Sequence, residues 1–247
     1  MKAMILAAGL GTRLRPLTDD RPKALVTVAG RTLLEIALCR LRSFGVREVI
    51  VNAHHYAEMI AKYLKANDNF GMRIEVSREE ELLETGGGLK KAAHFFRENL
   101  QEPFILHNVD VVSTIDLGRM MRFHAEEGAL ATLAVQDRES SRYLLFDEQE
   151  RLCGRRAGRD GEAEWARPAH EAQALGFCGV HVLSPQIFAK MKDEGAFSII
   201  DTYMSLATEG EKIVAFRADE YYWRDLGRPE NVKQAERDVE SGKLVLP

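Results

Sequence analysis

The chain has 247 residues and a formal net charge of −4 at pH 7, long enough for one layered α/β domain with a large core. Its basic and acidic residues are interspersed, which argues against a nucleic-acid or membrane partner. No apolar run approaches the roughly 18 residues of a membrane span, and the apolar run at the start is too short for a signal peptide. Three cysteines without a Cys-x-x-Cys pair favour a reducing compartment, so we expect a cytoplasmic protein.

The first motif along the chain is a glycine-containing loop. Residues 4–8 are apolar and are followed by Gly9 and Gly11, which predicts a buried strand that opens into a tight loop. Backbone N–H groups in such a loop can point at an anion, and Arg13 and Lys23 add positive charge beside them. The string is neither a P-loop nor the three-glycine dinucleotide fingerprint. We therefore predict a polyphosphate site here.

Helical and strand patterns alternate after this loop. We expect helices over residues 33–44, 56–64, 89–100 and 232–244, and strands over 48–52, 73–76, 104–108 and 221–223. The alternation predicts right-handed crossovers and an α/β fold with a mainly parallel, Rossmann-like sheet between helices. In such sheets ligands bind beyond the carboxyl ends of the strands.

The loop also carries a family resemblance. Its string Gly-x-Gly-Thr-Arg-x-x-Pro-Leu-Thr, followed by Pro22 and Lys23, resembles the signature of the sugar-1-phosphate nucleotidyltransferases, also called NDP-sugar pyrophosphorylases. The resemblance covers nearly the whole chain. The string Glu-Thr-Gly-Gly-Gly at 84–88 is most similar to N-acetylmuramate-1-phosphate uridylyltransferases, followed by the mannose- and heptose-1-phosphate guanylyltransferases. The family fold adds a small β-rich part that binds the acceptor.

The resemblance implies catalytic roles for four residues. Arg13 would hold the departing β- and γ-phosphates, and Lys23 would steady the α-phosphate and the acceptor phosphate. Asp110 and Asp225, each expected at a strand end, resemble the family's two Mg²⁺-binding aspartates, although a lone aspartate is more often a turn or capping residue. Val109 stands where the family usually has glycine, and its side chain would limit how closely a phosphate or sugar approaches.

The resemblance also implies how the base is held. Backbone groups at Gly87 and one upstream polar side chain, Glu81, would contact it. A carboxylate can accept hydrogen bonds from uracil or from guanine, so the base stays open, with a slight lean to UTP. Three adjacent glycines could instead be a plain linker. The complete expected nucleotide site is Leu6, Ala8, Gly9, Gly11, Thr12, Arg13, Glu81, Thr85, Gly86, Gly87 and Asn108.

The acceptor side has weaker signals. Residues 174–182 resemble the middle strand of the family's acceptor part, where Gly179 would let the sugar lie close and Phe177 would contact it. Many relatives carry Glu-Lys-Pro shortly before this strand, whereas here Arg167 precedes the proline and is the candidate for the lysine's role. Residues 151–170 predict a mobile surface loop. Trp165 would anchor this loop by burial, the commoner use of an aromatic side chain, and the alternative is that it covers a ligand.

The expected organisation is a single nucleotidyltransferase domain of residues 1–247. It would comprise a nucleotide-binding part over 1–135, an acceptor-binding part with the second aspartate over 136–228, and a C-terminal helix over 229–247. His107, His124 and His181 lie on apolar segments and are expected to be packed residues. No serine stands in a Gly-x-Ser-x-Gly string, so covalent catalysis is not indicated.

The predicted reaction is nucleotidyl transfer from an NTP to a sugar 1-phosphate with release of pyrophosphate, using Mg²⁺. The acceptor phosphate would attack the α-phosphorus in line, with positioning and charge neutralisation supplying most of the rate. One alternative is phosphocholine cytidylyl transfer, although those enzymes generally lack Glu-Thr-Gly-Gly-Gly. Another is a catalytically silent nucleotide-sugar sensor, against which the retention of all four catalytic residues argues. The sugar and the oligomeric state stay open.

Overall fold

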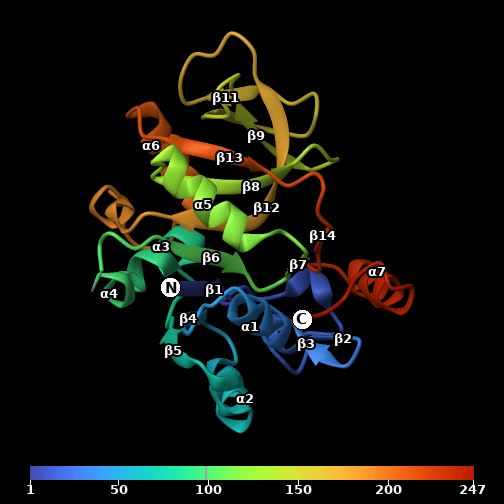
Figure 1. The fold of residues 1–247 in the computed structure, drawn as a ribbon. Coiled ribbons are helices and arrows are strands. Elements are labelled where there is room, and N and C mark those ends of the chain that lie inside the picture. Colours follow the sequence, from blue (N-terminus) through green and yellow to red (C-terminus); the bar gives the residue numbers. More distant parts are fainter. Residues whose placement is uncertain (98) are drawn as a thin grey trace.

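The computed structural model describes residues 1–97 and 99–247. A mixed sheet of ten strands crosses this part of the chain, beside two separate strand pairs (Figure 1). The sheet contains β1 (Lys2–Leu6), β4 (Glu48–Ala53), β5 (Arg73–Arg78), β6 (Phe104–Asn108), β8 (Ala131–Gln136), β9 (Arg142–Phe146), β10 (Leu152–Ala157), β11 (Ala163–Trp165), β12 (Gln173–Leu183) and β13 (Ile213–Arg217). The pairs are β2 (Thr27–Val28) with β3 (Arg31–Thr32), and β7 (Val111–Ser113) with β14 (Trp223–Asp225).

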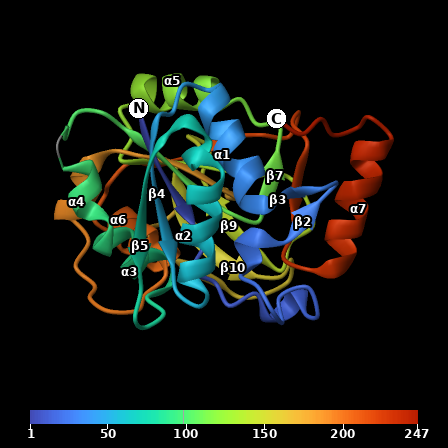
Figure 2. The same ribbon diagram turned by 90° about the horizontal axis from the view of Figure 1, so that it is seen from below.

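Helices cover the sheet on both sides. The α-helices are α1 (Leu33–Ser43), α2 (Ala57–Ala66), α3 (Glu84–Lys91), α4 (Ala93–Phe96), α5 (Leu117–Glu127), α6 (Ile199–Thr208) and α7 (Pro229–Glu240). Short 3₁₀ turns are η1 (Thr12–Leu14), η2 (Lys23–Leu25), η3 (Asp68–Gly71) and η4 (Pro185–Ala189). Seen from below, α7 lies at the opposite end of the molecule from α4 (Figure 2).

The predicted α/β fold is confirmed. Strands β5, β4, β1 and β6 pair in that order and are all parallel. The long strand β12 then joins β6 in the antiparallel direction and also pairs with β8 and β9. It therefore connects the parallel part to the β-rich part that the family resemblance implies. The boundary predicted after residue 135 falls inside β8, which pairs with two strands from the later part of the chain.

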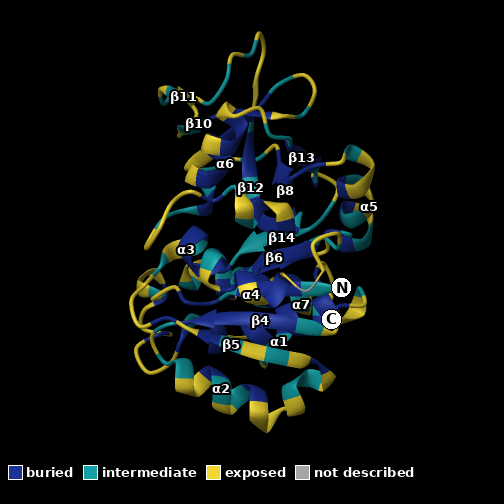
Figure 3. Cartoon of the chain, turned by 90° about the vertical axis from the view of Figure 1, so that its left-hand side faces the viewer, coloured by how far each residue is buried: buried dark blue, intermediate teal, exposed yellow. Residues whose placement is uncertain are grey.

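The central strands are buried on both faces, as their apolar runs predict. Ile5 and Val51 pack in the core under α1, α2 and α5, whereas Met4, Ile50 and Leu106 pack in the core under α3, α4 and α6. Successive side chains thus alternate between two hydrophobic layers. In Figure 3, β4 and β6 are dark blue at the centre, and the exposed yellow residues gather on outer helices such as α2.

The helix predicted over 89–100 is wrong in its bounds. In the structure α3 begins at Glu84, so the glycine triplet is helical. This helix ends before Ala92, and the short α4 begins at Ala93. Residue 98 lies outside the described residues. Glycine is a poor helix former, so residue propensities do not predict a helix through the glycine triplet. A Cβ on Gly87 would lie 2.1 Å from the carbonyl oxygen of Gly195, so tertiary packing, not propensity, selects glycine here.

The prediction of a surface loop over residues 151–170 is also wrong, because this stretch contains β10 and β11. Only the first half of β10 is buried, and β11 is an edge strand, so the usual apolar alternation is missing. Trp165 on β11 is 52% exposed and is not a buried anchor.

The bounds of one strand and one helix also differ from the predicted ones. β14 includes Asp225 rather than ending before it, and α7 covers Pro229–Glu240 instead of residues 232–244. Proline at the first helical position suits a helix start, because its missing N–H has no partner there. Within the part of the chain that the structure describes, no helix is both long and apolar enough to span a bilayer.

The packing of α3 gives a stability prediction. We expect Gly87→Ala to lower the free energy of unfolding by about 1–2 kcal/mol, because overpacking against backbone outweighs the gain in helix propensity. Urea unfolding measures this change. Gly9→Ala is the matched control, since its Cβ would meet nothing within 4 Å. Equal or higher stability of Gly87→Ala would contradict the packing explanation.

Candidate active site

The glycine loop leaves the sheet at the carboxyl end of β1. The N–H of Ala7 donates to Asn52 Oδ1 over 2.7 Å, and this contact fixes the point where the loop begins. Gly11 has a φ of 66°, and a Cβ there would lie 3.0 Å from Thr18 Cγ2. Both the left-handed backbone and the tight packing therefore require glycine at this turn.

The loop presents a run of unpartnered backbone donors. Among the described residues, no acceptor takes a hydrogen bond from the N–H groups of Gly9, Leu10, Gly11, Thr12 and Arg13. Gly9, Leu10, Thr12 and Arg13 are also exposed. Consecutive free amides at a turn form a concave anion-binding surface. The predicted polyphosphate loop thus has free donors in the expected place.

The two predicted aspartates are brought together by a strand pair. Asp110 follows β6, and β14 pairs antiparallel with β7 so that Asp225 stands opposite Val111. The N–H of Leu226 donates to the Asp110 carbonyl over 2.8 Å. The N–H of Gly227 donates to Asp225 Oδ1 over 2.5 Å and fixes that carboxylate.

Gly227 lies where the charged groups meet. A Cβ there would lie 2.6 Å from Asp225 Oδ1, 3.2 Å from Arg13 Nη2 and 3.6 Å from Asp110 Oδ2. Both carboxylates and the Arg13 guanidinium therefore line one small space beside the glycine loop. Glycine keeps that space open, because any side chain would fill it.

Lys23 reaches the same place from η2. Its Nζ contacts Asp110 Oδ2, and the two side chains are only 14% and 13% exposed. All four predicted catalytic residues, Arg13, Lys23, Asp110 and Asp225, thus belong to one cluster.

Val109 does not narrow the crevice. Its side chain is 3% exposed and belongs to the hydrophobic core, and its N–H donates to the Leu6 carbonyl. The neighbouring Asn108 ends β6 and lies against Gly179, where a Cβ would be 2.8 Å from Asn108 Nδ2. Glycine at 179, with a φ of 71°, is therefore required by the protein's own packing.

The predicted base-binding glycines are buried. The N–H groups of Gly86 and Gly87 both donate to the Phe197 carbonyl, and Thr85 Oγ1 accepts from the N–H of Ile199. These contacts satisfy donors of the first helical turn that have no partner inside the helix. In this structure neither glycine amide is free for a base.

The carboxylate that packs against the start of α3 is Glu79, and the contact predicted between Glu81 and the base stays a prediction. Glu79 is 5% exposed and accepts hydrogen bonds from Asn52 Nδ2 and from the N–H of Leu83, whereas Glu81 is exposed. The run of four charged residues at 78–81 gave no sequence signal to single out Glu79. Glu79 differs from its charged neighbours only in burial, because the alternation of exposed and buried side chains along β5 continues to it.

A cavity of about 970 Å³ opens beside Asp225. Its lining is Arg13, Gln136, Arg138, Glu139, Ser140, Ser141, Arg142, Phe177, Trp223, Arg224, Asp225, Arg228 and Asn231. Five arginines face two carboxylates, so the wall is strongly cationic. Arg138 stacks on Trp223 at 3.8 Å from the ring centroid and donates to the Phe177 carbonyl, which orders this wall.

Phe177, which is predicted to contact the sugar, lines this cavity, as does Trp223. Arg167 does not line it. The Arg167 guanidinium pairs with Asp147 and donates to the Leu152 carbonyl, so it is engaged at the start of β10. The suggested lysine-like role of Arg167 has no support in this geometry.

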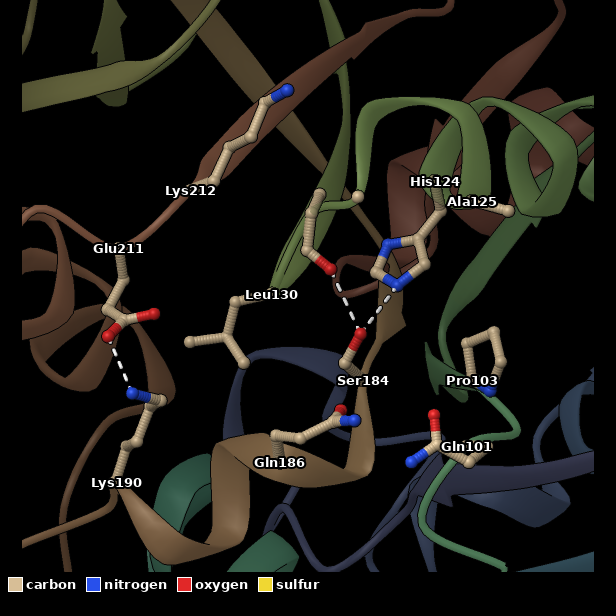
Figure 4. A pocket seen from close by; sticks show the side chains of 12 residues that line it. Gln101, Pro103, His124, Ala125, Leu130, Ser184, Gln186, Lys190, Glu211 and Lys212 are labelled. Carbon is tan, nitrogen blue, oxygen red and sulfur yellow. Dashed lines mark hydrogen bonds and ion pairs between the residues drawn. The ribbon is translucent and has the colours of Figure 1, made fainter.

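A serine–histidine contact lies in a separate cavity between α5 and η4 (Figure 4). His124 Nε2 is 3.0 Å from Ser184 Oγ, but the Ser184 hydroxyl donates to the Ala129 carbonyl. The imidazole therefore donates to Ser184 and cannot remove its proton. Burial lowers the pKa of His124 to about 4, as expected for a packed histidine.

The comparisons with known proteins agree with this geometry. The model of the nucleotidyl transferase family matches residues 2–242, so the chain belongs to this family. Among individual relatives, N-acetylmuramate alpha-1-phosphate uridylyltransferase of Caulobacter vibrioides is 36% identical over 242 residues and covers 95% of both chains. The mannose-1-phosphate guanylyltransferase catalytic subunit beta of Danio rerio is 29% identical over 94% of this chain and 62% of its own length.

Solved structures share the fold. A UDP-glucose pyrophosphorylase complexed with UDP-glucose has a TM-score of 0.77 at 17% identity, over 98% of both chains. HddC from Yersinia pseudotuberculosis complexed with GMP-PN has a TM-score of 0.73 at 22% identity, over 96% of this chain and 99% of that one.

The buried histidines predict how stability depends on pH. Burial lowers the pKa of His181 to about 3, below the value near 6.5 of an unfolded chain. Below pH 6.5 the unfolded state binds the extra proton, so stability falls as pH drops. We expect His181→Gln to reduce this fall by about 1.4 kcal/mol per pH unit between pH 5 and 4. Urea unfolding at several pH values measures the slope, and equal slopes would contradict the assignment.

Proposed function

We infer that this chain is a sugar-1-phosphate nucleotidyltransferase, which transfers a nucleoside monophosphate from an NTP to a sugar 1-phosphate. The observation that carries this conclusion is the meeting of Arg13, Lys23, Asp110 and Asp225 beside a loop of free amides. The family match and the relatives' names agree with it. A pyrophosphate-release assay with a panel of NTPs and sugar 1-phosphates tests it.

Different residues of the site bind different phosphates of the NTP. The free amides of residues 9–13 and the Arg13 guanidinium bind the β- and γ-phosphates that leave as pyrophosphate. Lys23 lies nearer Asp110 and steadies the α-phosphate and the attacking acceptor phosphate. That phosphate is already an anion, so the attack needs no general base. Positioning and charge neutralisation then supply the rate.

The paired carboxylates fit Mg²⁺. Both are oxygen donors, and they line the open space that a Cβ on Gly227 would fill. Mg²⁺ prefers one or two carboxylates together with phosphate oxygens and water, which suits a site with two protein ligands. When bound, the ion would offset negative charge on the phosphates.

The cationic cavity beside Asp225 is the proposed acceptor site. Arg142 lines this cavity, and no carboxylate among the described residues pairs with its guanidinium. A wall with surplus positive charge suits an acceptor that is itself anionic. We propose UTP as the donor because the relative from Caulobacter vibrioides is a uridylyltransferase.

The remaining assignments follow from weaker observations. Three buried free cysteines suit a reducing, cytoplasmic location. Phosphocholine cytidylyl transfer and a silent nucleotide-sugar sensor are the competing functions, and the same assay separates them. Turnover of phosphocholine with CTP would support the first, and binding without turnover the second.

The first mutational prediction concerns the aspartates. We expect Asp110→Asn or Asp225→Asn to lower turnover by about 10²–10³-fold, because each removes charge that a metal–phosphate complex needs. Chelation of divalent ions should abolish turnover of the wild-type protein, and added Mg²⁺ should restore it. Asp160→Asn, at an exposed position, is the control. Near-normal rates of either site variant would refute the two-aspartate site.

A second prediction separates the role of Lys23 from nucleotide capture. We expect Lys23→Ala to lower kcat by about 10²-fold while the Kd of the NTP changes much less, because loop amides carry most of the binding. Lys23→Arg should not fully restore kcat, since a planar guanidinium group replaces the compact ammonium group. Lys62→Ala on α2 is the surface control. Single-turnover rates and NTP titrations distinguish the outcomes, and lost binding with normal chemistry would reassign Lys23.

A further inference from the structure

The strand that carries Asp225 is short and stands apart from the main sheet. β14 contains three residues and, among the described strands, pairs only with β7. The indole of Trp223 donates to the Cys178 carbonyl over 2.7 Å, which ties the start of β14 to β12. Two-stranded ribbons are marginally stable by themselves, so the position of Asp225 needs further support. Helix α7 lies beside β14 and contacts it (Figure 1).

A buried carboxylate on α7 binds two residues next to Asp225. Asp238 is 4% exposed, and its Oδ2 accepts from the Tyr222 hydroxyl over 2.8 Å and from Arg224 Nη2 over 3.0 Å. Its Oδ1 accepts from Gln234 Nε2 over 3.0 Å. Arg224 Nε also donates to the Tyr222 hydroxyl oxygen over 3.0 Å. Because a buried carboxylate is costly without hydrogen bonds, this arrangement keeps β14 against α7.

A second contact from α7 reaches the backbone of the aspartate itself. Asn231 Nδ2 donates to the Asp225 carbonyl over 2.8 Å. Together with the contact of Asp238 with Arg224, this bond means that α7 holds two consecutive residues of β14. The helix also contacts β2 (Figure 2), which lies one residue after the turn η2 that carries Lys23. α7 therefore lies against segments from both ends of the chain that bring residues to the candidate catalytic cluster.

We propose that Asp238 is a positioning residue for the Asp225 carboxylate. It acts through Tyr222 and Arg224, which hold β14 in the place where Asp225 faces Asp110. The inference rests on the proposed function. Asp238 does not line the cavity beside Asp225, so the strand carries its effect to a bound cation and to the phosphates. A carboxylate that is fixed before its ligands arrive lowers the cost of ordering the site on binding.

Three variants separate the parts of this contact. Asp238→Ala removes the acceptor of both donors, so Arg224 loses its buried ion pair. Asp238→Asn keeps one oxygen that can accept from both donors, but it removes the negative charge. Tyr222→Phe removes one donor only. If Tyr222 acts through Asp238, its loss should add little once Asp238→Ala is present, which a double-mutant cycle measures.

The experiment measures the Kd of Mn²⁺ by electron paramagnetic resonance with saturating α,β-methylene-UTP, an analogue that cannot be cleaved, together with kcat, acceptor KM and Tm. We expect Asp238→Ala to raise the Mn²⁺ Kd and to lower kcat about tenfold each, the order of one lost hydrogen bond to a buried charge. Asp238→Asn and Tyr222→Phe should change both quantities by about threefold, because part of the contact remains. Acceptor KM and the Kd of the analogue without metal should not change.

Two controls separate positioning from stability. Glu240→Ala removes an exposed carboxylate from the same helix and should change neither the Mn²⁺ Kd nor kcat. Leu64→Ala removes a side chain on α2 that is 2% exposed, so it should lower Tm and leave the Mn²⁺ Kd unchanged.

Other results would overturn the proposal. A lower Tm of Asp238→Ala with an unchanged Mn²⁺ Kd would reduce Asp238 to a role in fold stability. A change in acceptor KM alone would show that Asp238 orders Arg224 for the acceptor and not β14 for the cation. Fully additive losses in the double variant would contradict a shared path through Asp238. If the wild-type protein binds neither Mn²⁺ nor the analogue, the proposed function fails too, and that failure is recognised before any substitution is made.

Discussion

The pairing of β7 with β14 is the constraint on which the site depends. The polypeptide leaves β6 at Asp110 and returns much later along β14, and the two short strands place Asp225 opposite Val111. Two carboxylates held this close repel each other in a partly buried place. The contact of Lys23 with Asp110 and the N–H of Gly227 on Asp225 offset that repulsion. The cluster thus combines two carboxylates with Arg13 and Lys23, and the glycine loop supplies free amides beside it.

A second constraint on the fold is that backbone segments approach each other closely at glycines. Gly86 and Gly87 let α3 lie against residues 195–197, so the Phe197 carbonyl caps the helix. Glycine costs about 1 kcal/mol relative to alanine inside a helix, and this cost is offset by contacts that no larger residue permits. Gly179 plays a similar part between β12 and Asn108. The two halves of the chain therefore meet at glycines as well as along the sheet.

Charge is arranged differently at the two ends of the site. At the proposed phosphate end the donors are backbone amides and a few fixed cations, which suits a compact polyanion. At the proposed acceptor end the arginines are ordered by stacking and pairing, such as Arg138 on Trp223 and Arg224 with Asp238. Strand β12 lies between these ends and pairs with β6, β8 and β9, so the sheet fixes their separation.

The sequence by itself determined the fold class, and it predicted the candidate phosphate loop and the four residues that the structure brings into one cluster. Apolar periodicity and glycine spacing are local signals, and the family string around Arg13 and Lys23 is contiguous. Only the tertiary structure decided that Glu79 is the carboxylate buried against the start of α3, because the charged residues around it look alike until β5 buries one of them. It also decided that the glycine triplet is helical and that residues 151–170 hold strands. The contacts around Glu79 and around the glycine triplet come from segments distant in the sequence, and local propensity does not contain them. Strands β10 and β11 pair locally, but their mixed burial gives no apolar alternation that would predict them.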